Sequence, residues 1–90
     1  MSIQKARFLS LVRKFAQNTT YGTRHIRHDV TEDEKTDLTL VAYRVYGDGD
    51  EWLTIQGAAG LDTPENPLVS QTLVLPTIED LQALKRQAGL

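Results

Sequence analysis

The stretch from Asp37 to Pro76, DLTLVAYRVYGDGDEWLTIQGAAGLDTPENPLVSQTLVLP, decides the fold of this chain. Its apolar residues first recur at helical spacing, and Gly47 interrupts them where a helix would end, because glycine adopts a left-handed φ at little cost. We therefore expect one helix over residues 37–46 and a second from about Glu51 to Gly60.

The buried faces of these two helices follow from the spacing i, i+3, i+4 and i+7. The apolar positions are Leu38, Val41, Ala42 and Val45 in the first helix and Trp52, Ile55 and Ala59 in the second, which Leu53 flanks. Thr36 or Asp37 would cap the first helix, since either side-chain oxygen can accept from an unpaired backbone amide. We interpret the single tryptophan as a cover for the core rather than as a platform for a sugar.

Two short β-strands are expected on either side of this helix pair. Residues 23–30 alternate between faces as a half-buried strand does. Residues 69–75 form a β-prone run that ends at Pro76, because proline has no N–H for the ladder. The intervening residues 62–67, DTPENP, indicate a rigid turn. The predicted fold is therefore α+β, with a strand, two helices and a strand in order.

An amphipathic helix is predicted on each side of this module. The first spans residues 2–17, a hinge would follow at residues 18–22 (NTTYG), and a short last helix would begin at the capping residue Thr77. The chain thus divides into a helical arm and hinge (1–22), a module (23–76) and a C-terminal helix (77–90). The apolar stripes that we expect to bind a partner are Phe8, Leu11, Val12 and Phe15 in the first helix and Ile78, Leu81 and Leu84 in the last.

Two other roles are open for the N-terminal stripe. It can cover the core of the module itself, which is the usual role of an amphipathic helix. It can also lie on a membrane surface, although no tryptophan of that helix would anchor it. No membrane or nucleic-acid partner is expected, and no stretch of the sequence approaches the roughly 20 apolar residues of a transmembrane helix.

The composition is that of a single globular domain. The chain has 90 residues, of which 40% are apolar and 24% charged. Cysteine is absent, which excludes disulfides, thiolate metal sites and a thiol nucleophile. The N-terminal residues lack the uninterrupted apolar segment of a signal peptide, so we expect folding in the cytoplasm.

Charge is distributed unevenly along the chain. Residues 1–28 carry six basic residues and no acidic one, whereas residues 29–90 carry four basic and all twelve acidic residues. The net charge of −2 therefore combines a basic first segment with an acidic body. Such a segment can dock on the body itself or on an acidic partner.

Residues suited to metal binding or catalysis do not form a convincing site. His25 and His28 would point to opposite faces of a strand, with His28 packed inward and His25 in solvent, and no third ligand has suitable spacing. The acidic run at residues 32–34 lacks the ligand pattern of a calcium loop, and we interpret it as solvated charge. No nucleophile–base pair or phosphate loop is visible, so we expect no enzyme, metal or cofactor.

The module resembles the LysM family. The segment Leu38–Asp48, LTLVAYRVYGD, is similar to the family's L-x-x-I-A-x-x-x-Y-G-D helix and turn. Residues 52–55 (WLTI) resemble its W-x-x-I, and residues 71–76 (QTLVLP) resemble its Q-x-L-x-I-P. This resemblance covers roughly residues 24–76 and implies a small β-α-α-β fold.

Within the family, the sequence of residues 37–52 is most similar to small LysM proteins of contractile phage tails and related injection systems. These proteins often carry the pattern D-x-L-D-L-I-A-Y-R-x-Y-G-D. That resemblance implies a non-catalytic part of a baseplate, present in several copies, which links the central hub or spike to wedge or sheath proteins. The protein would fold in the host cytoplasm and then become part of the tail baseplate of the virion.

Binding of peptidoglycan or chitin is the alternative that the family implies. Glycan-binding members usually carry a Gly-Asp-Thr turn before the first helix and a glycine before Gln71, where this chain has Lys35-Thr36-Asp37 and Ser70. Glycine permits close approach of a ligand to the backbone, so these differences favour the structural role. A glycan groove would use the two loops around the helix pair, with Thr31, Thr36, Asp37, Leu61, Asp62 and Asn66.

Overall fold

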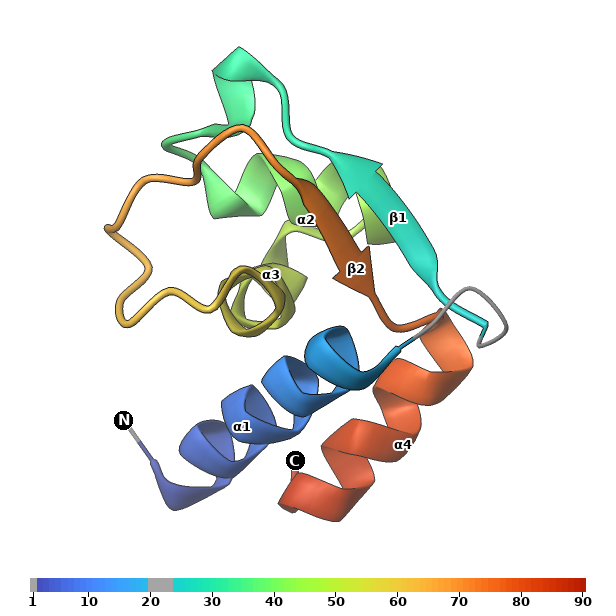
Figure 1. Ribbon diagram of the computed structural model, residues 1–90. Helices are drawn as coiled ribbons and strands as arrows, with labels where there is room; N and C mark the ends of the chain where they lie inside the picture. The colour runs from blue at the N-terminus through green and yellow to red at the C-terminus, as the bar shows by residue number, and fades with distance from the viewer. Residues whose placement is uncertain (1, 20–23) are drawn as a thin grey trace.

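The computed structural model describes residues 2–19 and 24–90 (Figure 1), so residues 20–22 of the predicted hinge lie outside the described part. Its elements are α1 (Ile3–Asn18), β1 (Ile26–Asp29), the 3-10 turn η1 (Glu32–Glu34), α2 (Leu38–Tyr46), the 3-10 turn η2 (Gly49–Glu51), α3 (Trp52–Ala59), β2 (Thr72–Leu75) and α4 (Ile78–Ala88). The predicted α+β class and the LysM-like β-α-α-β layout are confirmed, with one helix added at each end.

The two strands form an antiparallel sheet. Ile26 pairs with Leu75 and His28 with Leu73, which places these four residues on the same face. Leu73 and Leu75 are buried under the helices, as their alternation predicts. Beyond the ladder, the Val30 amide donates to the Gln71 carbonyl at 3.0 Å and prolongs the pairing toward the loops.

Helix α2 begins and ends where local chemistry predicts. The Asp37 carboxylate accepts from the Leu40 amide at 3.2 Å and satisfies one of the unpaired N–H groups of the first turn. Gly47 ends the helix with φ at +73°, in the left-handed region that glycine tolerates best. The first hydrophobic cluster contains Leu38, Val41, Ala42, Ile55, Leu68, Leu73 and Leu75.

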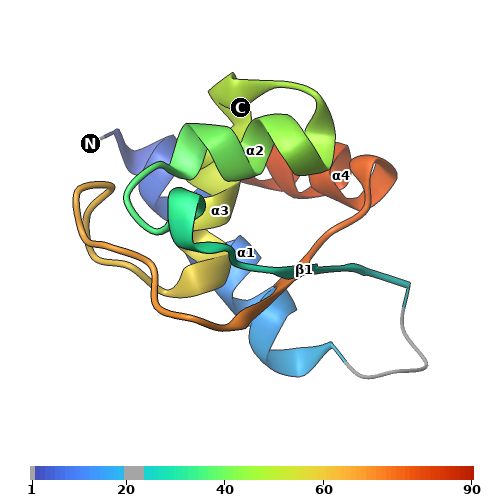
Figure 2. The same ribbon diagram turned by 90° about the horizontal axis from the view of Figure 1, so that it is seen from above.

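A second hydrophobic cluster lies on the other side of α3. Helices α1 and α4 lie side by side there (Figure 1), and the cluster contains Phe8, Val12, Leu81 and Ala88. Helix α3 lies between α2 and α1 (Figure 2), so it is buried on more sides than its predicted stripe of apolar residues alone would cover. Thr54, Gln56 and Gly57 are therefore buried as well.

Contacts between α3 and its neighbours join the two clusters. A Cβ added to Gly57 would lie 3.0 Å from the Val12 Cβ, so this glycine allows α1 to approach α3 closely. Tyr46 packs against both clusters, and its hydroxyl donates to the Pro76 carbonyl at 2.7 Å. Both terminal helices thus pack on the module. No helix in the described ranges is long and apolar enough to cross a membrane.

Candidate functional site

The predicted partner-binding stripes lie mostly inside this chain, which corrects the sequence-based expectation. Phe8, Val12 and Leu81 are at most 2% exposed, and Leu11 and Leu84 pack beside them in the second cluster. These side chains contact the chain's own helices because α1 packs on both α3 and α4, and Leu53 and Ala58 of α3 pack against the same cluster. The N-terminal stripe therefore covers the chain's own core, which was the alternative role expected of an amphipathic helix.

Two residues of the stripes differ from the rest. Phe15, near the end of α1, is half-buried. Ile78, the first residue of α4, is 56% exposed and does not join the cluster. Only Ile78 therefore retains a largely accessible apolar side chain among the residues expected to bind a partner.

The residues predicted for a glycan groove are divided between two places. Thr36 and Asp37 line a pocket of about 280 Å³ at the start of α2. Leu61 and Asp62 instead line a cavity of about 380 Å³ between α3 and the polar side of α1. Each of these two pockets therefore holds two of the six residues that the glycan-binding alternative would use.

The remaining two groove residues take part in local turns. The Thr31 hydroxyl and amide bond to the acidic residues of η1. Asn66 closes a turn by donating its amide to the Thr63 carbonyl at 3.3 Å. Between these loops the Leu68 amide donates to the Lys35 carbonyl at 2.6 Å, and the buried Leu68 side chain anchors the second loop on the core.

The smaller pocket combines an apolar floor with an acidic edge. It is lined by Thr36, Asp37, Leu38, Thr39, Trp52 and Pro64. Trp52 packs on the first cluster as expected, but one part of its surface also faces this pocket. Hydrogen bonds from the Thr39 hydroxyl (2.5 Å) and the Leu40 amide lower the pKa of Asp37 and keep it ionised.

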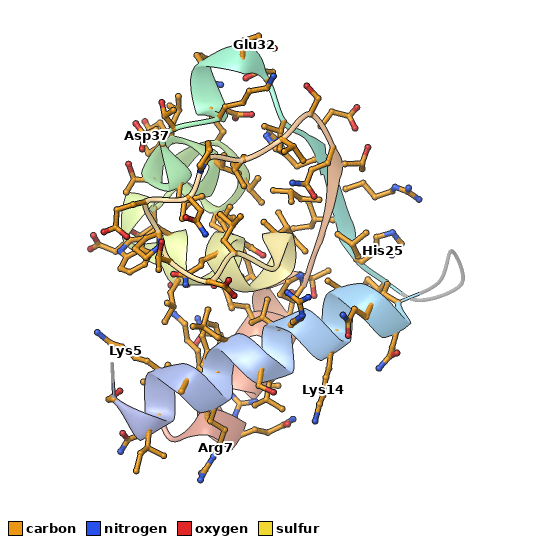
Figure 3. All side chains as sticks on the ribbon, turned by 60° about the vertical axis from the view of Figure 1, so that its left-hand side comes forward. Lys5, Arg7, Lys14, His25, Glu32 and Asp37 are labelled. Atoms are coloured by element: carbon orange, nitrogen blue, oxygen red, sulfur yellow. The ribbon has the colours of Figure 1, made fainter. Side chains whose placement is uncertain are left out.

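Two more carboxylates belong to residues next to those that lie in or near this pocket. Glu65 follows Pro64, which lines it, and a Cβ on Gly49, next to Asp50, would lie 3.5 Å from the Thr39 carbonyl oxygen. Both Asp50 and Glu65 are exposed. We call the pocket and the carboxylates of Asp37, Asp50 and Glu65 the acidic pocket. Figure 3 shows Asp37 and Glu32 at the end of the molecule remote from α1.

The sequence missed the burial of Glu34. We expected solvated charge at residues 32–34, yet Glu34 is 0% exposed. Its carboxylate accepts from the Thr31 amide (2.8 Å), contacts His28 Nε2 (2.9 Å) and pairs with Arg44 Nη1 (3.1 Å). Burial alone would raise the pKa of Glu34, but these partners lower it to about 2.

The histidines follow the predicted alternation only in part. His28 is inward, as expected, and its ring meets Glu34. His25, expected in solvent, is instead half-buried and has a partner.

The cavity beside α1 contains a buried polar group. Gln56 is 0% exposed, and its Nε2 donates to the carbonyls of Leu61 (3.3 Å) and Asp62 (3.4 Å). Its Oε1 has no hydrogen-bond partner among the described residues. Arg13 lies over Gly60 at the end of α3, where a methyl group on the glycine would collide with the guanidinium. The negative end of the α3 dipole stabilises a cation at this position.

The outer side of α1 forms the second chemically distinct surface. Ile3, Arg7 and Lys14 are exposed and follow one another at helical spacing, and Ile3 is 75% exposed. Figure 3 shows Arg7 and Lys14 projecting away from the module. Their side chains form no ion pair or hydrogen bond with another residue in the described ranges. We call these three residues the cationic row.

The cationic row and the acidic pocket are thus two described surfaces of opposite charge. The first carries unpaired cations beside an exposed isoleucine, and the second has the Asp37 carboxylate at the edge of an apolar floor. Comparisons with protein-family models, with curated proteins and with solved structures found no match to this chain.

Proposed function

We propose that this chain is a non-catalytic, LysM-like structural adaptor of a phage-type contractile tail. It would occur in several copies in the baseplate and link the hub or spike to wedge or sheath proteins. The resemblance of residues 37–52 to tail-associated LysM proteins and the β-α-α-β layout support this function. The partner surface, however, is not the apolar stripe of α1.

The cationic row is the observation that carries the proposal. The buried side chains of Phe8 and Val12 pack α1 on the rest of the domain, so the outer side of this helix has a fixed position. Arg7 and Lys14 on that side have no carboxylate of the described chain to neutralise them. A rigid helix with unpaired cations is suited to an acidic protein surface, because charge complementarity raises the association rate and selects the partner.

Incorporation into assembled tails tests this function. Tails would be purified from cells that produce either the unsubstituted chain or Arg7→Glu, and the protein would be quantified in intact particles. We expect the unsubstituted chain in the baseplate and at least a tenfold loss for Arg7→Glu, about 1.4 kcal/mol or more of binding free energy. Arg86→Glu on α4 changes the charge equally at another exposed arginine and should incorporate normally.

Two results would contradict this proposal, the first for the adaptor function and the second for the cationic row as its contact surface. One is complete and functional tails from cells that lack the protein. The other is equal incorporation of Arg7→Glu and the unsubstituted chain, which would remove the role of the cationic row in the partner contact.

Glycan binding is the second candidate, and the acidic pocket favours it. Residues of both predicted loops, Thr36 and Pro64, meet there beside Trp52, and an aromatic surface next to polar groups is suited to a sugar ring. Sedimentation with peptidoglycan sacculi tests this function. Co-sedimentation that N-acetylglucosamine oligomers compete away, and that Trp52→Ala abolishes, would support it. Protein that remains in the supernatant, beside a glycan-binding LysM control that sediments, would exclude it.

A further inference from the structure

The two charged surfaces lie at opposite ends of one small domain. The cationic row is on the outside of α1, whereas the acidic pocket lies at the start of α2 (Figure 3). The domain extends 33 Å in its two longer directions, and the Debye length at physiological salt is about 8 Å. Each surface therefore acts on a neighbouring molecule largely without cancellation by the other.

Each of the two surfaces also carries apolar groups. Ile3 extends from the N-terminal turn of α1 with 75% of its surface exposed, and Arg7 lies one turn behind it. The pocket has an apolar floor that includes Leu38 and Trp52, and about 280 Å³ is enough for one aliphatic side chain. A cation one turn from Ile3 would then meet the carboxylates around the pocket.

We propose that copies of this chain associate head to tail, with the cationic row of one copy seated on the acidic pocket of the next. Ile3 would enter the pocket, and Arg7 and Lys14 would pair with the carboxylates of Asp37, Asp50 and Glu65. This contact deepens the proposed function, because it names the neighbouring copy as one partner of the adaptor. A second copy is the partner that we expect on the acidic pocket, because its cationic row has the opposite charge.

Such a contact has a defined symmetry. Its two halves are different surfaces, so the contact is heterologous, and successive copies form a closed ring or an open filament. A ring would suit a part that surrounds a central tail axis. A single helix face is smaller than the roughly 800 Å² per partner of a standard stable interface, so the isolated contact is weak and depends on salt.

A reciprocal charge exchange tests the contact with the purified full chain. Variant A carries Arg7→Glu and Lys14→Glu, so both of its surfaces are acidic. Variant B carries Asp50→Lys and Glu65→Lys, so Asp37 is left as the last carboxylate of a basic pocket. None of these four side chains forms an ion pair with another described residue, so both variants should fold, as circular dichroism would check.

Sedimentation velocity at about 0.02 M salt should show that the unsubstituted chain associates as its concentration rises and dissociates at about 0.5 M salt. Variants A and B should each be monomeric under the low-salt condition. Their equimolar mixture should associate again, because the acidic helix of A meets the basic pocket of B. Ile3→Ser should weaken the association about tenfold, whereas Arg86→Glu should leave it unchanged.

Three outcomes would overturn the head-to-tail contact. They are an unsubstituted chain that stays monomeric at low salt, variants that associate as the unsubstituted chain does, and a mixture of A and B that remains monomeric. Each outcome is independent of tail incorporation, since an adaptor that contacts only hub or sheath proteins would still enter tails. Failure of the contact and failure of the proposed function are therefore distinguishable.

Discussion

At the scale of single residues, Glu34 shows how a buried charge is stabilised. It is the last carboxylate of an acidic run, and its neighbour Glu32 is largely exposed, with a side chain that is 86% accessible. Glu34 turns inward because the Thr31 amide, His28 and Arg44 together replace the water that its carboxylate loses. Removal of such a carboxylate destabilises the fold, because its hydrogen-bond and ion-pair partners then lose their acceptor.

Substitution of Glu34 should make the domain less stable and change its response to acid. Glu34→Gln should lower the free energy of unfolding at neutral pH by roughly 1–3 kcal/mol, because the Arg44 and His28 contacts lose their ionised acceptor. The folded-state pKa of about 2 lies below the ordinary value of 4.5, so the carboxylate stabilises the fold fully above pH 4.5. That stabilisation is lost as the pH falls from 4.5 toward 2.

Urea unfolding at several pH values measures this effect. The difference in unfolding free energy between the unsubstituted chain and Glu34→Gln should be largest at neutral pH and should shrink as the pH falls through that window. Glu32→Gln, at an exposed position in the same turn, is the control and should change stability little. A difference that stays constant down to pH 2 would contradict the assignment of the acid response to Glu34.

At the scale of elements, Gly57 sets how closely α1 approaches α3. The Cβ of any larger residue would lie 3.0 Å from the Val12 Cβ and 3.3 Å from the Leu9 carbonyl oxygen. Glycine inside a helix costs about 1 kcal/mol of helix propensity relative to alanine. The close contact compensates for that cost, because it lets the Val12 side chain be completely buried.

A bulky residue at Gly57 should separate the two helices. Gly57→Leu should lower the free energy of unfolding by roughly 1–3 kcal/mol, because the backbone of α1 has to move away from an overpacked contact. Urea unfolding followed by Trp52 fluorescence measures this change. Gln82→Leu adds the same side chain at an exposed position of α4 and should have little effect. Equal stability of the two variants would show that α1 does not depend on this contact.

At the scale of the whole molecule, two hydrophobic clusters share one central helix. Helix α3 faces the sheet and α2 on one side and the α1–α4 pair on the other (Figures 1 and 2). Tyr46 bridges the clusters, and the Lys85 ammonium pairs with Glu51 between α4 and the start of α3. We therefore expect the domain to unfold as one cooperative unit.

Truncation of Phe8 tests this cooperativity. Phe8 is 1% exposed in the second cluster, so Phe8→Ala should lower the free energy of unfolding by about 3–5 kcal/mol. Circular dichroism and Trp52 fluorescence should report the same midpoint, although Trp52 packs on the first cluster. Ile3→Ala, on the exposed side of the same helix, should change stability by less than about 0.5 kcal/mol. Two separate transitions in Phe8→Ala would contradict a single cooperative unit.

Local signals in the amino-acid sequence were sufficient to predict the α-helices and β-strands and their order. Asp37, Gly47, Pro76 and Thr77 begin or end elements as predicted, because capping, left-handed φ and a missing N–H act within a few residues of the chain. The faces of α2 and β2 followed from periodicity for the same reason. Short-range physics was sufficient for the β-α-α-β layout.

Only the tertiary structure decided what each apolar or charged face contacts. An amphipathic stripe is equally suited to a partner and to the chain's own core, and the pairing of α1 with α3 and α4 settled that choice for Phe8. Glu34 is buried because Arg44, ten residues further along the chain, reaches it from α2. These outcomes depend on contacts between residues far apart in sequence, which periodicity and local propensity do not encode.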